Sequence, residues 1–316
     1  MPRLQGIQHK VCVGSPPKIL GFTNEKDVPV SDALFVASQY VMPKKAMTQL
    51  AGALARARLG GLTHSFIRWF VGKYQVNMDE AAQPDITQYA CFNDFFTRPL
   101  KAGARPLADA PFVCPVDGAV SQLGPIHGDQ IFQAKGHSYS TQALVGGDAG
   151  LASQFQDGHF ATIYLSPKDY HRIHMPSAGR LRRMIYVPGD LFSVNPATAR
   201  GVPGLFARNE RVVCVFDMPA ASGATPQQFV LVLVGATIVG SMATTWHGVV
   251  NPPRTGHVRE WTYDDQDIQF KQGDEMGRFL LGSTVVLLWP KDTVALTPAW
   301  QAAQPVRLGE VMGQAA

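Results

Sequence analysis

Short runs of β-branched and aromatic residues follow one another from about Phe112 to the end of the chain. The clearest runs lie at 160–166, 182–188, 211–218, 229–235 and 284–289, and glycine, proline and other turn residues separate them. Runs of this length with turn signals between them are typical of antiparallel strands, whereas βαβ units would need a helical period between strands. We therefore predict a mainly antiparallel β-sandwich or barrel-like core.

The segment FVLVLVGATIVGSMATTW (229–246) is the place where a transmembrane helix competes with strands. Residues 218–253 contain no Asp, Glu, Lys or Arg, and an apolar stretch of this length can cross a bilayer. The segment is rich in Val, Ile and Thr, however, and Gly235 and Gly240 divide it into short lengths. Because β-branched residues between glycines favour buried strands joined by tight turns, we predict strands here.

The N-terminal part differs from the rest because its pattern is helical. Ser31 can cap a helix, Pro43 stops or kinks that helix, and Gly60 with Gly61 ends a second one before a third at 62–74. The chain is thus predicted to be α+β. Its predicted parts are an extension without periodicity (1–30), a helical region (31–100) and a β-rich domain (101–316).

Charge in the helical region is one-sided. Between Ala33 and Met78 no residue is acidic, and the basic residues are Lys44, Lys45, Arg56, Arg58, Arg68 and Lys73. Basic amphipathic helices that also carry Trp and Phe lie in membrane interfaces, where anionic headgroups attract each basic residue by roughly 1 kcal/mol. The alternative is an ordinary helical layer with a solvated basic face. The net charge of +4 is mild, and we expect no nucleic-acid partner.

The four cysteines give no sign of metal or disulfide chemistry. They lie far apart and share no CxxC or Cys/His ligand spacing: Cys12, Cys91, Cys114 and Cys214. We therefore expect reduced thiols and no metal site. The N-terminus lacks the apolar run of a secretory signal, so the chain is expected to stay in the compartment where it is made.

Three separate stretches carry residues suited to acid–base or nucleophilic chemistry. PVDG places Asp117 in a turn before a strand, which by itself is ordinary turn chemistry. YLSPKDYHRIHMP places His171 and His174 three residues apart, and without further metal ligands nearby a general base is favoured over a metal site. RFLLGSTVVLLW interrupts an apolar strand with Gly282 and Ser283.

Asp117, His174 and Ser283 are the parts of a nucleophilic triad. The usual hydrolase context is missing, because Ser283 is not in a G-x-S-x-G elbow and Gly282 before it lies inside a predicted strand. A serine in this position can reach the carbonyl carbon of its own preceding peptide bond if the backbone bends. Glycine permits that bend at little steric cost.

Together these stretches resemble the bacterial phosphatidylserine decarboxylase proenzymes. The likeness rests on LGST before residue 285, on the histidine motif and on the PVDG turn, and it extends over roughly residues 32–295. Further stretches that carry it are FNDFFTRPL (92–100), QAKGHSYS (133–140), VPGDLFSVN (187–195), LFARNERVV (205–213), LVGATIVGS (233–241) and GDEMGRFLLGST (273–284). LGST alone is common, but its combination with the histidine motif in this order is specific.

The resemblance implies a self-cleaving zymogen. Ser283 would attack the carbonyl of Gly282, with His174 as base and Asp117 orienting it, and the resulting ester would break by elimination. The cut would lie inside the β-rich catalytic domain and would give a β chain of residues 1–282 and an α chain of residues 283–316. What remains of Ser283 would become a covalent pyruvoyl cofactor.

The resemblance further implies a carboxy-lyase of phospholipid biosynthesis. The pyruvoyl group would form a Schiff base with phosphatidylserine and withdraw the electrons released as CO2 leaves, giving phosphatidylethanolamine. His171 would contact the substrate and protonate its α-carbon, and Tyr164 would shape the substrate pocket. The helical region would dock on the membrane. A peripheral enzyme on the cytoplasmic face of the inner membrane is implied, as a homodimer of processed protomers.

Two other functions predict different outcomes. A serine hydrolase that uses Asp117, His174 and Ser283 on an external ester or amide would keep its chain intact. A non-enzymatic membrane-surface module would also stay uncut, and its lipid binding would survive Ser283→Ala. Neither of these two functions explains why the PVDG turn, the histidine motif and LGST occur together in one chain.

Overall fold

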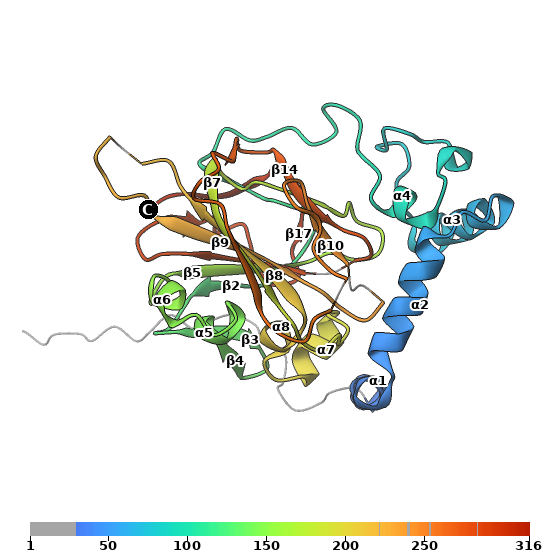
Figure 1. Ribbon diagram of the computed structural model, residues 1–316, viewed down its shortest axis with the longest axis horizontal. Helices are drawn as coiled ribbons and strands as arrows, with labels where there is room; N and C mark the ends of the chain where they lie inside the picture. Colours follow the sequence, from blue (N-terminus) through green and yellow to red (C-terminus); the bar gives the residue numbers. More distant parts are fainter. Residues whose placement is uncertain (1–29, 221, 239–240, 253, 283) are drawn as a thin grey trace, which may run out of the picture.

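The computed structural model describes residues 30–220, 222–238, 241–252, 254–282 and 284–316 (Figure 1). N-terminal helices lie at one side of a β-rich core that contains most of the remaining chain. The α+β class, with helices first and mainly antiparallel sheets after them, is confirmed. Residues 1–29, and with them nearly all of the expected extension, lie outside the described residues, as do Cys12 and Ser283.

Four helices precede the β core, and the predicted breakers Pro43 and Gly60 lie between the first three of them, whereas Ser31, predicted as a cap, lies inside the first helix. They are α1 (Val30–Val41), α2 (Lys44–Arg56), α3 (Gly61–Tyr74) and α4 (Phe92–Phe96), with the 3-10 helix η1 (Ile86–Gln88) before α4. Pro43 separates α1 from α2, since its ring does not fit a helix interior. Gly60 precedes α3 with φ +55°, a left-handed value that glycine adopts without steric cost. A small core joins α3 to α4: Ile67, Phe70, Phe92, Phe95 and Phe96.

A nine-stranded sheet forms the centre of the β core. Its strands are β2 (Gly118–Pro125), β5 (His159–Tyr164), β7 (Gly179–Val187), β8 (Arg211–Asp217), β9 (Gln228–Val234), β12 (Arg259–Thr262), β13 (Gln269–Phe270), β15 (Thr284–Trp289) and β17 (Pro305–Val306). Their order is β12–β7–β8–β9–β15–β5–β2–β17, β13 also pairs with β7, and the pairings are antiparallel. The five predicted runs are β5, β7, β8, β9 and β15. Among the described strands this sheet is open, with β12 and β17 at its edges, and the closed alternative is not observed.

The central strands are buried on both faces of this sheet. Along β15, Val285, Leu287 and Trp289 join one apolar cluster, whereas Val286 and Leu288 join another. Successive side chains of a strand point to opposite faces, so a continuous apolar run can fill two cores at once. The continuous apolar run of β15 is therefore explained by a strand that is packed against other side chains on both faces of the sheet.

Smaller sheets cover one face and short helices the other. The first cluster includes residues of a four-stranded sheet, ordered β11–β10–β14–β6, and of a three-stranded sheet, ordered β1–β18–β16. These strands are β1 (Phe112–Val113), β6 (Arg172–His174), β10 (Met242–Thr244), β11 (Gly248–Val249), β14 (Glu275–Phe279), β16 (Val294–Leu296) and β18 (Val311–Ala315). The second cluster includes residues of α5 (Thr141–Leu144), α6 (Ala149–Ser153), α7 (Pro196–Gly201), α8 (Leu205–Arg208) and the hairpin β3 (Gln130–Ala134) and β4 (His137–Ser140).

The apolar segment 229–246 contributes strands, as predicted, and not a transmembrane helix. It contains most of β9, which pairs with β8 and β15 in the middle of the large sheet, and β10 of the four-stranded sheet. In the described ranges, no helix combines the length and the apolar character needed to cross a bilayer.

The run 278–289 is two strands and not a single interrupted one, which corrects the prediction that Gly282 lies inside a strand. β14 ends at Phe279 in the four-stranded sheet, and β15 starts at Thr284 in the large sheet. Leu280, Leu281 and Gly282 connect them. Since strands of two different sheets flank Gly282, the segment lies where the sheets meet.

Candidate active site

His171 lies directly before β6, with its side chain fully buried. Its Nδ1–H donates to the carbonyl of Asp169 at 2.7 Å, so the neutral ring carries its lone pair on Nε2. The ring packs against that of Phe96, with centroids 4.1 Å apart. Burial lowers the pKa of His171 to about 3, which keeps the imidazole neutral near pH 7.

The Nε2 atom of His171 points at Gly282. A Cβ atom built on Gly282 would lie 2.9 Å from Nε2. This nitrogen is buried and has no hydrogen-bond partner among the described residues. A buried nitrogen acceptor without a partner is costly in a folded protein and is found where a ligand or a reaction uses it. The sequence-predicted residues His171 and Gly282 are thus brought together.

His174 ends β6, which pairs with β14. Its Nδ1–H donates to the carbonyl of Gly273 at 2.8 Å, and its Nε2 accepts from the hydroxyl of Tyr170 at 3.1 Å. Burial lowers the pKa of His174, while the Gly273 carbonyl and the charges of Glu275 and Asp117 oppose that change. His174 is therefore also a neutral ring with its acceptor at Nε2.

Asp117 lies in the turn before β2 and is buried. Arg105 donates to both of its carboxylate oxygens at 2.6–3.1 Å, and the backbone N–H of Leu308 donates to Oδ1 at 2.9 Å. In the described part of the chain these groups, and not His174, hold the carboxylate. The expected orientation of His174 by Asp117 is absent there, and the Gly273 carbonyl fixes its tautomer instead.

Backbone contacts nevertheless bring the predicted site segments together. The N–H of His174 donates to the carbonyl of Pro115, two residues before Asp117. Tyr164, at the end of β5, is paired with Thr284 on one side and with Ala119 on the other. Ser283 lies outside the described residues, between Gly282 and Thr284.

Gly118, next to Asp117, permits the close approach of β2 and β5. A Cβ atom there would collide with the backbone carbonyl oxygen of Tyr164. Only glycine allows this contact, so the PVDG turn brings Asp117 close to the strand pair that contains Thr284.

A largely apolar cavity of about 250 Å³ opens beside Gly282. Its lining includes aromatic side chains of α3, of α4 and of β5: Phe70, Tyr74, Phe92, Phe96 and Tyr164. Burial raises the pKa of Tyr164, so its hydroxyl stays protonated. The predicted pocket residue Tyr164 and the N-terminal helices therefore border the same cavity as Gly282.

Sequence reasoning missed three residues of this site. Arg105 and Tyr170 hold Asp117 and His174, and Phe96 covers the ring of His171. Phe96 lies in the motif FNDFFTRPL and Tyr170 in the motif YHRIH, but neither motif by itself indicates what these two side chains contact. Arg105 lies outside the quoted stretches. In the described ranges, no group of three or more His, Cys, Asp or Glu side chains could hold a metal ion.

The N-terminal helices carry an apolar surface exposed to solvent. Large hydrophobic side chains exposed on it or between the helices are Leu34, Phe35, Tyr40, Val41, Leu50, Leu54, Leu59, Leu62, Phe66 and Trp69. Exposed apolar patches of this kind mark sites that contact proteins or membranes. The same segment also carries basic residues and, between Ala33 and Met78, no acidic ones. We call the exposed hydrophobic residues and the basic residues of this segment together the exposed helical surface.

Comparison with known proteins points to one family. A family profile described as phosphatidylserine decarboxylase matches residues 92–314, and a second, described as PSD, matches residues 34–75. Curated relatives named phosphatidylserine decarboxylase proenzyme come from several bacteria. That of Dechloromonas aromatica (strain RCB) is 68% identical over 284 residues, covering 90% of this chain and 99% of the relative. That of Herminiimonas arsenicoxydans is 68% identical over 285 residues, covering 90% and 95%.

Proposed function

This chain belongs to the phosphatidylserine decarboxylase family, and from that membership we propose that it is a proenzyme that cleaves itself between Gly282 and Ser283 and then decarboxylates phosphatidylserine. The resemblance seen in the sequence motifs is confirmed by the family match. The observation that best supports the activity is the unpartnered Nε2 of buried His171 facing Gly282.

The residues around Gly282 suit a pyruvoyl group formed from Ser283. The apolar cavity beside Gly282 gives a lipid amine access to this position, and a neutral imidazole lies against it. A pyruvoyl group supplies the electron sink that decarboxylation of an α-amino acid requires. The protein's own part is to bind and orient the substrate and to move protons.

For self-cleavage we assign the base to His174. Its Nε2 carries a lone pair that the Tyr170 hydroxyl occupies at 3.1 Å, so this hydroxyl would have to turn away before Nε2 accepts the hydroxyl proton of Ser283 as the oxygen attacks the carbonyl of Gly282. The Asp117 charge favours the imidazolium that forms, because it raises the pKa of His174 against the effect of burial. Arg105 holds Asp117 in place for this electrostatic function.

For decarboxylation we assign proton transfer to His171. With a pKa of about 3, its Nε2 is an acceptor near pH 7. It would take the proton that the substrate ammonium loses when the amine reacts, and it would return a proton to the α-carbon once CO2 has left. Phe96 on the ring face and the cavity wall exclude water from this nitrogen.

The exposed helical surface supports binding to a membrane. Apolar side chains on it would enter the headgroup boundary, and the acid-free basic residues would attract anionic lipids. We propose a peripheral enzyme on the cytoplasmic face of the inner membrane. The proposal includes a homodimer of processed protomers, which light scattering coupled to size exclusion in detergent would measure.

Denaturing mass spectrometry and a decarboxylation assay test the assignment. We expect two fragments, ending at Gly282 and beginning with the remnant of Ser283, and CO2 release from phosphatidylserine. Ser283→Ala and His174→Ala should stay uncut, whereas His171→Ala should be cut but decarboxylate about 10²–10⁴-fold more slowly. Cleavage that fails in His171→Ala but proceeds in His174→Ala would exchange the two histidines. An intact, active wild-type chain whose Ser283 is acylated by inhibitors would instead indicate a serine hydrolase.

A further inference from the structure

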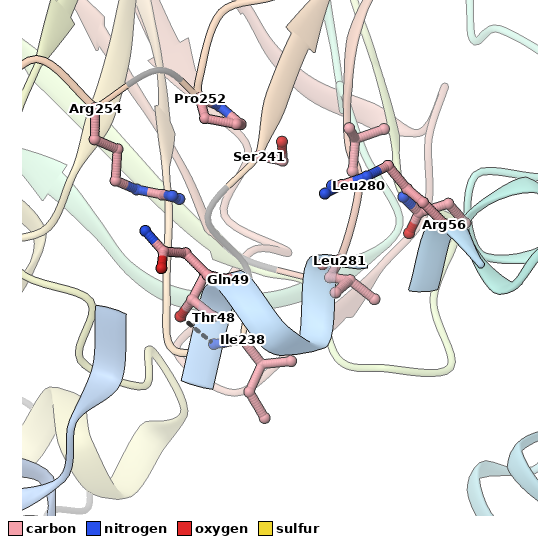
Figure 2. A pocket seen from close by; sticks show the side chains of 11 residues that line it. Thr48, Gln49, Arg56, Ile238, Ser241, Pro252, Arg254, Leu280 and Leu281 are labelled. Atoms are coloured by element: carbon pink, nitrogen blue, oxygen red, sulfur yellow. Dashed lines mark hydrogen bonds between the residues drawn. The ribbon is translucent and has the colours of Figure 1, made fainter. Parts of the chain in front are cut away.

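A second cavity, of about 360 Å³, adjoins the apolar cavity at the segment before Gly282. Figure 2 shows the side chains that line this second cavity. Ile238 and Leu281 line both cavities. The other described lining residues of the second cavity are Thr48, Gln49, Gly52, Arg56, Asn93, Ser241, Pro252, Arg254 and Leu280. The two cavities are therefore neighbours that share part of one wall.

Helix α2 forms one wall of the second cavity. Thr48, Gly52 and Arg56 follow one another at intervals of four residues, which places them on one face of the helix. Leu50 and Leu54 lie on the opposite face, where they are 62% and 58% exposed. The helix thus presents its cavity wall towards the β core and its leucines away from it. If those leucines enter the membrane, the cavity lies directly beneath the bilayer surface.

The lining of this cavity is cationic. Its described residues include two arginines and no acidic residue. The Nε of Arg254 donates to Glu210 at 3.0 Å, so a carboxylate compensates part of that charge. Arg56 lies next to Leu280 at the other end of the cavity and forms no ion pair within the described ranges (Figure 2). The Arg56 guanidinium folds back over Gly52, whose missing side chain leaves room for it.

We propose that this second cavity binds the phosphodiester of the phosphatidylserine headgroup, with Arg56 as its principal contact. Guanidinium groups bind phosphate through paired, charge-assisted hydrogen bonds. In the substrate the phosphate lies between the serine amine, which must reach the position after Gly282, and the acyl chains, which stay in the membrane. The second cavity lies between Leu281 and the exposed leucines of α2, in the same order. This inference rests on the proposed function.

The test compares Arg56→Gln with Arg58→Gln in the full-length, self-processed protein. Arg58 is a matched control, because it is exposed, lies two residues away and lines neither cavity. Decarboxylation is measured in nonionic detergent micelles with increasing mole fractions of phosphatidylserine, and self-cleavage is followed by mass. We expect Arg56→Gln to raise KM about 10-fold, equivalent to about 1.4 kcal/mol, with unchanged cleavage. Arg58→Gln should leave KM within about twofold of the wild type.

Equal KM values for both variants and the wild type would overturn the inference while leaving the proposed function intact. An equal rise in both would also overturn it, because it would indicate general attraction to an anionic surface. Absence of decarboxylation by the wild type would refute the proposed function instead. The phosphate contact is then measured separately, by calorimetric binding of dihexanoyl phosphatidylserine below its micelle concentration to Ser283→Ala with and without Arg56→Gln. Equal affinities there would refute the phosphate site.

Discussion

Gly282→Ala is the substitution that most directly tests the contact between His171 and the cleavage segment. The new Cβ atom would lie 2.9 Å from His171 Nε2, whereas ordinary contacts begin at about 3.4 Å. The imidazole is a poor candidate for moving aside. It is fully buried, its Nδ1 is bonded to the Asp169 carbonyl and its face lies against Phe96. The variant must therefore bear the overlap as strain.

Overpacking of a buried site costs about 1–3 kcal/mol of unfolding free energy. The restrained ring argues for the upper half of that range. If His171→Ala is added, the overlap disappears, and the cost of Gly282→Ala should fall to a few tenths of a kcal/mol. The expected coupling free energy between the two substitutions is about 1–3 kcal/mol. This exceeds the deviation from additivity of about 0.3–0.5 kcal/mol that is usual for substitutions at distant, independent sites.

The assay is a double-mutant cycle in urea, carried out on Ser283→Ala protein so that the chain stays in one piece. Gly72→Ala on helix α3 is the control, because a Cβ there meets nothing within 4 Å. Alanine in place of an exposed helical glycine should stabilise by about 0.5–1 kcal/mol, with or without His171. An equal cost of Gly282→Ala in the presence and in the absence of His171 would refute the contact on which the proposed active site depends.

Three further outcomes follow from the site and the exposed helical surface. Burial lowers the pKa of His171 from 6.5 to about 3, so between these pH values only the unfolded chain binds a proton at this residue. The free energy of unfolding should therefore fall by up to about 1.4 kcal/mol per pH unit as the pH drops from about 6.5 to 3. His171→Gln should flatten this slope in urea titrations at several pH values, and an unchanged slope would contradict the prediction. Tyr170→Phe removes the hydrogen bond that favours neutral His174, so the pH profile of self-cleavage should shift upwards by up to about one unit; an unmoved profile would exclude His174 as the base or Tyr170 as its partner. Trp69→Ser should weaken binding to anionic vesicles roughly 5–10-fold while cleavage continues. The control Val258→Ser, at a similarly exposed residue on the β core, should leave vesicle binding unchanged, and equal effects of the two substitutions would argue against the exposed helical surface as the membrane contact.

Local patterns in the sequence predicted the N-terminal helices and five strands of the large sheet. Pro43 and Gly60 separate helices because one lacks a backbone donor and fits poorly in a helix, while the other adopts a positive φ. The segment 229–246 forms strands because its β-branched residues suit a pleated, buried surface. These preferences act within a few residues, so they can be read without knowing the fold.

The geometry around Gly282 was not accessible in this way. The interruption in 278–289 predicts a flexible point inside one strand, but β14 and β15 pair in different sheets. The partner of a strand is chosen by residues far away in the chain, and no local period encodes that choice. The same holds for Arg105, whose ion pair with Asp117 has no motif of its own.

The amino-acid sequence alone indicates the residues suited to this chemistry: two histidines, an aspartate, and a glycine–serine pair in motifs that the chain shares with its family. Which histidine lies against the proposed cleavage segment follows from the tertiary packing alone. Both rings carry their acceptor on Nε2, but Tyr170 occupies that of His174, whereas that of His171 faces Gly282. Composition and spacing cannot separate residues three positions apart, because the difference between them arises from what each side chain packs against after the sheets have paired.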